Sequence, residues 1–333
     1  ALLRAIWYPT TVATQSYTIR KVILDYLERT GDPSLIDFKL HDFGARGVSS
    51  MESAGIGGAA HLVNFMGSDT VSGVLYAREF YNAGIAGFSI PAAEHSTITS
   101  WGRKGEVDAY GNMLTQFAKP GSIVAVVSDS YDVFNAAEKL WGEALRQQVV
   151  DSGATVVIRP DSGDPLTINQ QLIEILGRKF GYTTNDKGFK VLNNVRLIQG
   201  DGVNELSIRS ILGGFMAMGW SADNIAFGMG GALLQQVDRD TQKFAMKCSS
   251  ALVNGEWVDV QKDPATDPGK KSKAGRVQLW TNSGGEFASS VGAPTGWTDK
   301  GIGGWTPALV EVYRDGKLTG EITFNEVRAN AKR

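Results

Sequence analysis

The chain has 333 residues, of which 42% are hydrophobic and 20% are charged, and its formal net charge is −2. This composition is typical of a soluble globular protein, and the near-zero charge excludes a general attraction to nucleic acid or to anionic membranes. The apolar runs are too short to span a bilayer, no secretory or transit segment is visible, and the lone Cys248 excludes an internal disulfide and fits the cytoplasm.

The first third of the chain predicts three strands and one helix. The strands are expected at "FKLHDFG" (38–44), "HLVNF" (61–65) and "AGFSIPAAEH" (86–95). A glycine-rich helix start, "SAGIGGAAH" (53–61), lies between the first two.

Four later runs each place a β-branched apolar stretch directly before Asp or Gly. They are "SIVAVVSDSYD" (122–132), "ATVVIRPDSGDP" (154–165), "VRLIQGDG" (195–202) and "NIAFGMGG" (224–231). Such runs are typical of strands buried on both faces. Helical patterns alternate with them, as at 133–150 and 169–180. Seven strand candidates in βα units predict an α/β fold, an incomplete (β/α) barrel with its site at the carboxyl ends of the strands.

Beyond Gln236 the pattern alternates and turns often, which predicts short antiparallel strands. A basic, turn-rich loop follows at 263–276, and the tail from 323 predicts a short helix. We therefore expect a barrel domain over residues 36–235. Residues 1–35 and 236–333 are expected to form a second, partly antiparallel β domain.

The chemistry-bearing residues gather at the predicted strand ends. The three histidines show neither HxH nor HExxH spacing, and no GxSxG motif is present. Carboxylates can hold ribose hydroxyls or Mg²⁺, glycine amides can bind phosphate, and an arginine can balance charge. The pattern thus indicates a phosphosugar site. The residues are Asp69, Asp129, Asp132, Arg159, Asp161, Gly200, Asp201, Gly230 and Gly231.

A series of motifs in order resembles the nicotinamide phosphoribosyltransferases, which are type II phosphoribosyltransferases. The motifs are "KLHDFGARGVSS", "PAAEHSTITSWG", "VVSDSYD", "IRPDSGDP", "IQGDGVN", "NIAFGMGGALLQ" and "KDPATDPGKKSKAGR". The resemblance implies transfer of phosphoribosyl from 5-phosphoribosyl-1-pyrophosphate to nicotinamide, which yields nicotinamide mononucleotide and pyrophosphate in NAD salvage. It also implies a homodimer. Family members carry a segment ahead of the point where this chain begins, and we expect that segment to be absent here.

The resemblance also implies roles at the nicotinamide ring. Phe43 would stack on the pyridine ring, Asp69 would accept a hydrogen bond from the carboxamide, and Ser128 would lie at the ring pocket. Ordinary alternatives are core packing for Phe43 and a helix N-cap for Asp69.

For the sugar and phosphates, the resemblance implies ligand-binding arginines at Arg46 and Arg159 and a ribose partner at Asp161. An unrelated ion pair between Arg159 and Asp161 is the alternative. Gly200, Asp201, Gly230 and Gly231 would line the ribose and phosphate, with plain turn glycines as the alternative.

His95 resembles the family's phosphorylated histidine, which ATP hydrolysis would convert to phosphohistidine, with Asp132 as the residue that orients the ring. His41 and His61 are expected to be structural hydrogen-bonding groups. Mg²⁺ is the expected cofactor and ATP a co-substrate, and the metal ligands are not predicted.

Four more cations complete the expected set by resemblance. Arg239 and Lys247 would reach the phosphate across a dimer interface, and Lys262 and Lys270 would bind ATP or pyrophosphate. Solvated surface charge is the alternative for each of them.

Two rival functions remain open. A nicotinate or quinolinate phosphoribosyltransferase would share the fold, although an acidic ring substituent would repel Asp69. A non-catalytic nucleotide-binding barrel is the other.

Overall fold

The computed structural model describes residues 2–292 and 303–332. The chain divides into two compact units, Leu2–Gln242 and Lys243–Arg333. Residues 2–35 group with the larger unit, and the sequence-based boundaries at 36 and 235 stay a prediction.

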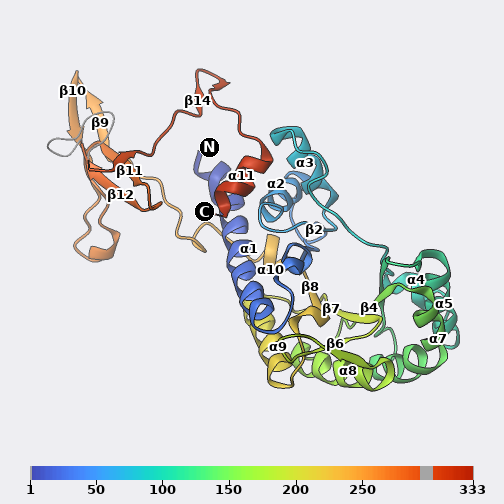
Figure 1. The fold of residues 1–333 in the computed structure, drawn as a ribbon. Coiled ribbons are helices and arrows are strands. Elements are labelled where there is room, and N and C mark those ends of the chain that lie inside the picture. Colours follow the sequence, from blue (N-terminus) through green and yellow to red (C-terminus); the bar gives the residue numbers. More distant parts are fainter. Residues whose placement is uncertain (1, 293–302, 333) are drawn as a thin grey trace. The chain divides into compact units, whose positions relative to one another are not determined.

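The larger unit is built on a six-stranded sheet in which every paired strand is parallel, in the order β2-β1-β8-β7-β4-β3. Figure 1 shows β8, β7 and β4 following one another across it. The structure confirms a strand within each of the predicted runs 38–44, 122–132, 154–165, 195–202 and 224–231. The six strands are β1 (Leu40–Asp42), β2 (Gly67–Ser68), β3 (Ile123–Val127), β4 (Thr155–Arg159), β7 (Val195–Gln199) and β8 (Ile225–Met229).

An irregular extended segment joins the two edges of this sheet. Phe88 forms a parallel bridge with Gly67 in β2, and Ala92 forms one with Ala125 in β3. Between them Pro91 has no N–H to donate, which prevents a continuous strand. This segment lies within the strand predicted at 86–95. It closes a ring of seven strand positions, one fewer than the eight of a complete (β/α) barrel, and confirms the predicted fold class.

The strand predicted at 61–65 is wrong. His61 is the last residue of α2 (Met51–His61), and the chain turns after it. The strand that follows α2 is β2, at Gly67–Ser68. His61 is fully buried, with Nδ1 bonded to Ser16 Oγ and Nε2 to the carbonyl of Gly67. A short apolar run does not by itself distinguish a buried helix end from a strand.

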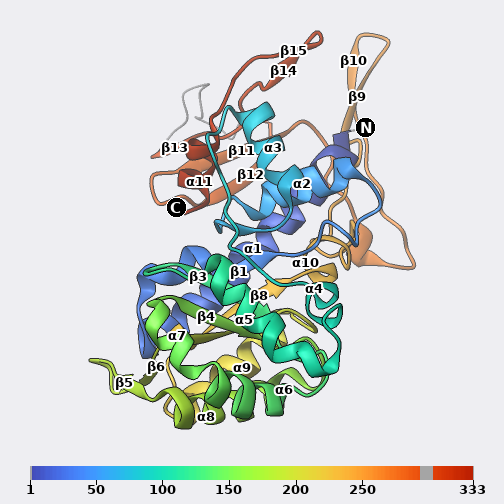
Figure 2. The ribbon, with the colours of Figure 1, turned by 90° about the vertical axis from the view of Figure 1, so that its right-hand side faces the viewer.

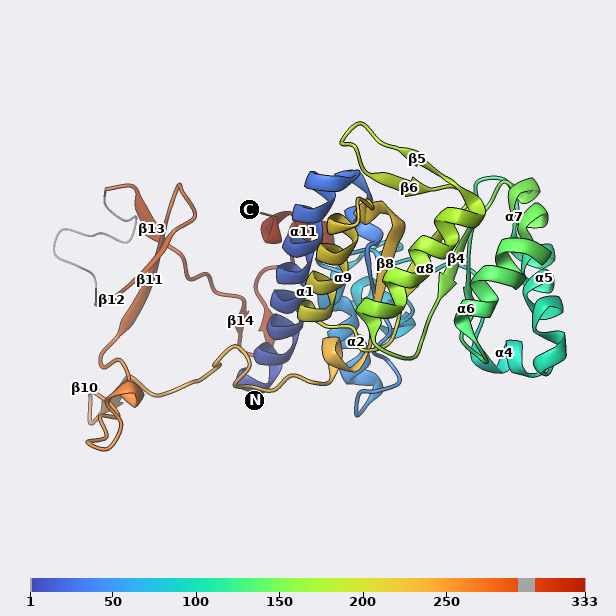
Figure 3. The same ribbon diagram turned by 90° about the horizontal axis from the view of Figure 1, so that it is seen from below.

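Helices surround the ring, and α8 and α9 pack side by side outside the sheet (Figure 2). The long N-terminal helix α1 packs beside α9 (Figure 3). No described helix is long and apolar enough to cross a membrane. Besides α2, the helices are α1 (Leu2–Thr30), α3 (Val71–Tyr81), α4 (His95–Thr99), α5 (Glu106–Phe117), α6 (Val133–Asn135), α7 (Arg146–Ser152), α8 (Pro165–Phe180), α9 (Glu205–Ala217) and α10 (Gly231–Leu234).

The helix predicted at 133–150 is not one regular α-helix. It comprises α6, a π-helical stretch at Ala136–Ala144, and the start of α7. The helix predicted at 169–180 is confirmed within α8. Asp164 caps that helix through the backbone N–H of Thr167, and Pro165 occupies its first turn. A short hairpin, β5 (Tyr182–Thr184) and β6 (Lys190–Leu192), was not predicted.

The interior of the ring holds a small apolar cluster. Ala125, Val157 and Ile198 are buried there, and Phe43, Ile90 and Ala226 pack against them. A separate and much larger core fills the space between the sheet and the surrounding helices. The interior of the barrel is therefore filled by side chains, and Phe43 is part of this packed interior.

The smaller unit confirms the predicted antiparallel strands and the C-terminal helix. All strand pairs between its described residues are antiparallel, and the 263–276 loop contains only a short 3₁₀ turn at Pro268–Lys270. Its elements are β9 (Ser250–Val253), β10 (Glu256–Asp259), β11 (Val277–Asn282), β12 (Phe287–Val291), β13 (Trp305–Pro307), β14 (Tyr313–Arg314), β15 (Lys317–Leu318) and α11 (Phe324–Ala331).

Candidate active site

Phe43 directly follows β1, and its backbone N–H donates to the carbonyl of Met229 at the end of β8 (3.0 Å). Its ring lies against backbone that lacks side chains. A Cβ on Gly228 would be 2.0 Å from Phe43 Cε2, and one on Gly200 would be 3.5 Å away. The half-buried Phe43 ring thus packs on the apolar interior of the barrel at the carboxyl ends of the strands. Core packing is real here, and it fixes the ring where a ligand could reach it.

Asp69 follows β2, the strand next to β1. Its backbone N–H donates to the carbonyl of Asp42 (2.9 Å), and Ser89 Oγ donates to its Oδ1 (2.5 Å). The N-cap of α3 is Thr70, and no side chain caps that helix. The Asp69 carboxylate is therefore not the N-cap considered above. Ser89 was missed by the sequence analysis, although it lies within the segment predicted as a strand.

His95 opens α4 and faces three carboxylates. Its Nε2 lies 3.0 Å from Asp129 Oδ1, while Nδ1 lies 3.9 Å from Asp161 Oδ2 and 4.0 Å from Glu94 Oε2. The expected orienting residue, Asp132, does not contact the ring in the structure. Its carboxylate instead accepts from two backbone N–H groups at the start of α6, at 3.0 Å each, as its N-cap.

Arg159 and Asp161 meet at the end of β4. A Cβ on Gly200 would lie 3.1 Å from Asp161 Oδ1 and 3.6 Å from Arg159 Cδ, so β7 ends beside both. Among the described residues the two side chains do not form an ion pair with each other, and the Asp161 carboxylate lies 3.9 Å from His95 Nδ1 instead. Arg159 donates instead to the carbonyl of Ala93 (3.3 Å). Burial raises the pKa of Asp161; Arg159 opposes the shift, and nearby Asp129 adds to it.

Ser128 is fully buried behind this site. Its hydroxyl donates to the carbonyl of Val126 (3.0 Å) and accepts from Trp141 Nε1 (3.0 Å). The bond from Trp141 holds the end of β3 against the surrounding helices, and the bond to Val126 is local to the strand. A place at the ring pocket stays a prediction for this residue.

Glycines and charges at the remaining strand ends are placed as follows. A Cβ on Gly230 would lie 3.4 Å from the carbonyl oxygen of Phe43, and Gly231 begins α10. Arg46 is exposed in the turn after Phe43, and Asp201 is exposed after β7.

The other predicted cations are exposed. Arg239 pairs with its neighbour Asp240 (2.6 Å). Lys247, Lys262 and Lys270 belong to the smaller unit, where Lys270 pairs with Asp267 (3.2 Å).

Several buried polar atoms near the strand ends have no hydrogen-bond partner within the described part of the chain. They are Asp42 Oδ2, Thr70 Oγ1, Ser130 Oγ and Arg159 Nε. Buried polar groups in proteins are normally hydrogen-bonded, so such a concentration favours a site that receives a polar ligand. Across residues 2–292 and 303–332, no group of three or more His, Cys, Asp or Glu side chains is arranged to hold a metal ion.

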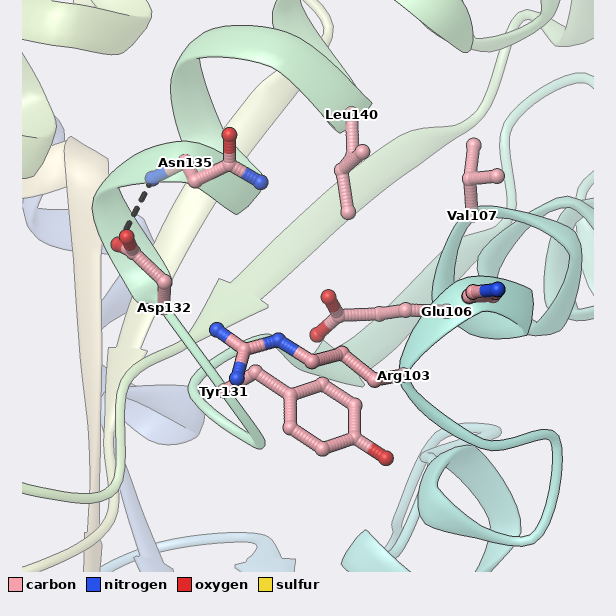
Figure 4. Close-up of a pocket in the computed structure, with 8 residues that line it drawn as sticks. Arg103, Glu106, Val107, Tyr131, Asp132, Asn135 and Leu140 are labelled. Atoms are coloured by element: carbon pink, nitrogen blue, oxygen red, sulfur yellow. Dashed lines mark hydrogen bonds between the residues drawn. The ribbon is translucent and has the colours of Figure 1, made fainter.

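A separate pocket of about 340 Å³ opens beside Asp132 (Figure 4). The guanidinium of Arg103 lies over the Tyr131 ring, 5.4 Å from its centre, and burial raises the pKa of Glu106. The lining carries both positive and negative side chains, so its charge does not favour either anionic or cationic ligands. The lining residues are Arg103, Lys104, Glu106, Val107, Tyr131, Asp132, Asn135 and Leu140.

Comparisons with known proteins agree on one family. The profile of the nicotinate phosphoribosyltransferase (NAPRTase) family matches residues 38–295. A nicotinamide phosphoribosyltransferase from Xanthomonas campestris pv. campestris is 56% identical, over 99% of this chain and 70% of that protein. One from Acinetobacter baylyi is 32% identical, over 97% and 67%. The crystal structure of nicotinate-nucleotide pyrophosphorylase from Pyrococcus furiosus superposes with a TM-score of 0.61 at 17% identity, covering 98% of this chain and 69% of that one, and supports the fold.

Proposed function

Because the chain belongs to the nicotinate phosphoribosyltransferase family of enzymes, we propose that it transfers phosphoribosyl from 5-phosphoribosyl-1-pyrophosphate to nicotinamide in NAD salvage. The 56% identity to a protein named nicotinamide phosphoribosyltransferase, over nearly the whole chain, supports this substrate. The observation that carries the proposal is the meeting of Phe43, Arg159 and Asp161 around Gly200 at one end of the barrel.

Ring binding falls to Phe43 and Asp69. The Phe43 ring stacks on the pyridine, and the Asp69 carboxylate accepts from the carboxamide NH₂. Ser89 holds that carboxylate in place. This geometry also separates nicotinamide from nicotinate, since a ring carboxylate would be repelled by Asp69.

Sugar transfer requires the bond from the anomeric carbon to pyrophosphate to break while the bond to the pyridine nitrogen forms. Positive charge develops on the ribose, and pyrophosphate leaves with the electron pair. Asp161 holds the ribose hydroxyls, and Arg46 and Arg159 balance the phosphate charge. The backbone at Gly200, Asp201, Gly230 and Gly231 lines the ribose and phosphate. Positioning and fixed dipoles supply most of the rate enhancement.

Mg²⁺ fits a place beside Asp161 and Asp201, whose negative charges act on one another. This ion usually keeps several waters and needs only one or two carboxylates together with substrate phosphates, so a preformed protein cage is not required. When bound, it neutralises the charge of the departing pyrophosphate.

His95 serves ATP coupling. Its imidazole takes the γ-phosphoryl group of ATP, and the resulting phosphohistidine promotes substrate binding. The 3.0 Å contact between its Nε2 and a carboxylate supports this role, because such a contact fixes which nitrogen is free.

Further parts of the proposal concern assembly. The enzyme works as a cytoplasmic homodimer, in which Arg239 and Lys247 reach a phosphate of the neighbouring subunit. Lys262 and Lys270 bind ATP or pyrophosphate. Their exposure supports access to anionic ligands.

The test is a steady-state comparison of nicotinamide, nicotinate and quinolinate, each with 5-phosphoribosyl-1-pyrophosphate and Mg²⁺, with and without ATP. We expect the highest kcat/KM for nicotinamide and stimulation by ATP. A preference for either acid would overturn the ring assignment. Isothermal titration that finds nicotinamide mononucleotide binding without turnover would indicate the non-catalytic barrel.

A further inference from the structure

Asp129 is a buried carboxylate, with its side chain 5% exposed, and both of its oxygens are engaged by groups of the candidate site. Oδ1 contacts His95 Nε2 at 3.0 Å. Oδ2 accepts from the backbone N–H of Asp161 (3.0 Å) and from Ser162 Oγ (2.6 Å). One side chain therefore joins the histidine of α4 to the turn after β4.

We propose that Asp129 is a positioning residue that fixes the reactive nitrogen of His95 and couples this ring to the Asp161–Ser162 turn. The inference rests on the proposed function for its chemistry and deepens it. It gives Asp129 the orienting role that the family resemblance implied for Asp132.

The attachment of Asp129 to the fold is rigid. The adjacent Ser128 donates its backbone N–H to the carbonyl of Arg159 (2.9 Å), which extends the β3–β4 pairing to the site. The Ser128 hydroxyl is held by Trp141 and Val126. A carboxylate anchored in this way can hold a ring at a fixed angle.

The contact with Oδ1 selects one tautomer of the neutral imidazole. A carboxylate only accepts, so Nε2 carries the proton and Nδ1 keeps its lone pair. Nδ1 lies 3.9 Å from Asp161 Oδ2, and it therefore faces the region where the ribose ligand is proposed.

The phosphoryl step can then be written in full. Nδ1 attacks the γ-phosphorus of ATP, a P–N bond forms, and the bond to the β–γ bridging oxygen breaks. ADP leaves with the electron pair of that bond. The Nε2 proton stays on the ring, where Asp129 stabilises the positive charge of the phosphorylated imidazole. Water later cleaves the P–N bond and releases phosphate.

The second oxygen transmits the state of the ring to the sugar site. A shift of His95 on phosphorylation moves the carboxylate that holds the backbone of Asp161. Since Asp161 is the proposed ribose ligand, the change reaches 5-phosphoribosyl-1-pyrophosphate through two hydrogen bonds. Asp129 thus connects phosphorylation of His95 to ribose binding at Asp161, and a substitution can break the connection at either end.

Asp129→Asn cuts the histidine side. The asparagine oxygen still accepts from Asp161 and Ser162, but its NH₂ donates to Nε2, which moves the ring proton to Nδ1 and blocks the nucleophile. We expect ³²P incorporation from γ-labelled ATP to fall by about 10²-fold or more.

Ser162→Ala cuts the loop side. The contact between His95 and Asp129 remains, so phosphorylation should proceed as in the parent, while ATP should lower the KM for 5-phosphoribosyl-1-pyrophosphate much less. Asp132→Asn is the matched comparison, because asparagine caps a helix as well as aspartate does. It should remain phosphorylated.

The proposal is overturned if Asp129→Asn is labelled at the parental rate, or if Asp132→Asn loses labelling in its place. Failure of the parent protein to take up label would instead refute ATP coupling. In that case ¹⁵N NMR of the His95 ring still decides the positioning role. We expect the proton on Nε2 in the parent and on Nδ1 in Asp129→Asn, and an unchanged tautomer would refute it.

Discussion

A Cβ placed on Gly228 would lie 2.0 Å from Cε2 of Phe43, so the aromatic ring occupies the space that any larger residue at position 228 needs. Gly228 is the second-last residue of β8, at a backbone conformation that alanine can adopt. Its role is to leave room for the ring.

Gly228→Ala should therefore displace Phe43 and lower kcat/KM for nicotinamide by about 10²-fold, as misplacement of a substrate-positioning group can do. Gly111→Ala is the control. Its Cβ would meet Leu145 at an ordinary 3.5 Å on helix α5, and activity should not change. The double variant Gly228→Ala, Phe43→Ala should regain the stability that the clash removes. A double variant no more stable than Gly228→Ala would show that the ring is not the cause.

Asp69 should decide between nicotinamide and nicotinate. In Asp69→Asn the repulsion of a ring carboxylate is removed and a donor is gained, while the bond from Ser89 can remain. We expect kcat/KM to fall about tenfold for nicotinamide and to rise for nicotinate, as expected for loss of one hydrogen bond to a charged group. Ser89→Ala keeps the charge, and it should weaken nicotinamide without helping nicotinate. Parallel losses for both substrates in Asp69→Asn would contradict the assignment.

The strand-end pattern was sufficient to predict the ring, because four apolar runs that end in Asp or Gly are buried on both faces. The same reasoning failed where the only evidence for a strand was a short apolar run. Residues 61–65 are as apolar as a strand, but His61 completes a helix whose buried face the local sequence does not reveal. The edge-closing segment is irregular because Pro91 cannot donate, and only tertiary contact places it.

In the candidate site the resemblance gave the orienting role to Asp132, whereas the structure places Asp129 against the His95 ring. Both follow β3 within the same motif. The local sequence did hold a clue, since Asp132 directly precedes a helical run and so occupies an N-cap position. Its carboxylate is consumed by backbone amides. The contact of Asp129 depends on α4, which is 34 residues away in sequence, and no local pattern reports that distance.

Two buried groups should make opposing contributions to stability between about pH 4 and pH 6. Burial lowers the pKa of His61 from 6.5 to about 4. The free energy of unfolding that neutral His61 contributes is fully present above pH 6.5. It is lost as the pH falls from 6.5 through 4, because the unfolded chain binds the proton first. Burial raises the pKa of Asp42 from 3.8 to about 6. Its contribution is present below pH 3.8 and is lost as the pH rises through 6.

Asp42→Asn isolates the second effect. The asparagine oxygen can still accept from the backbone N–H of Gly44, which Asp42 Oδ1 holds at 2.7 Å. Relative to the parent, the variant should gain about 2 kcal/mol in free energy of unfolding between pH 4 and pH 7. Urea unfolding at both pH values measures this difference. Asp186→Asn, on an exposed turn, controls for loss of one negative charge. A constant difference between Asp42→Asn and the parent would show that Asp42 is not the titrating group.

Asp161 and Asp164 lie three residues apart in the turn after β4, and they should differ sharply in function. Asp161 lies beside Gly200 and His95, whereas Asp164 caps α8 and points its carboxylate at the backbone of Thr167. Asp161→Ala should reduce kcat/KM for 5-phosphoribosyl-1-pyrophosphate by about 10²-fold, with ATP or without it, because ribose positioning serves every turnover. Asp164→Ala should lower the melting temperature and leave kcat nearly unchanged. His95→Ala should abolish only the stimulation by ATP, so the three variants separate sugar binding, fold and coupling. If Asp161→Ala lost no more activity than Asp164→Ala, the ribose would have to be held elsewhere in the barrel mouth.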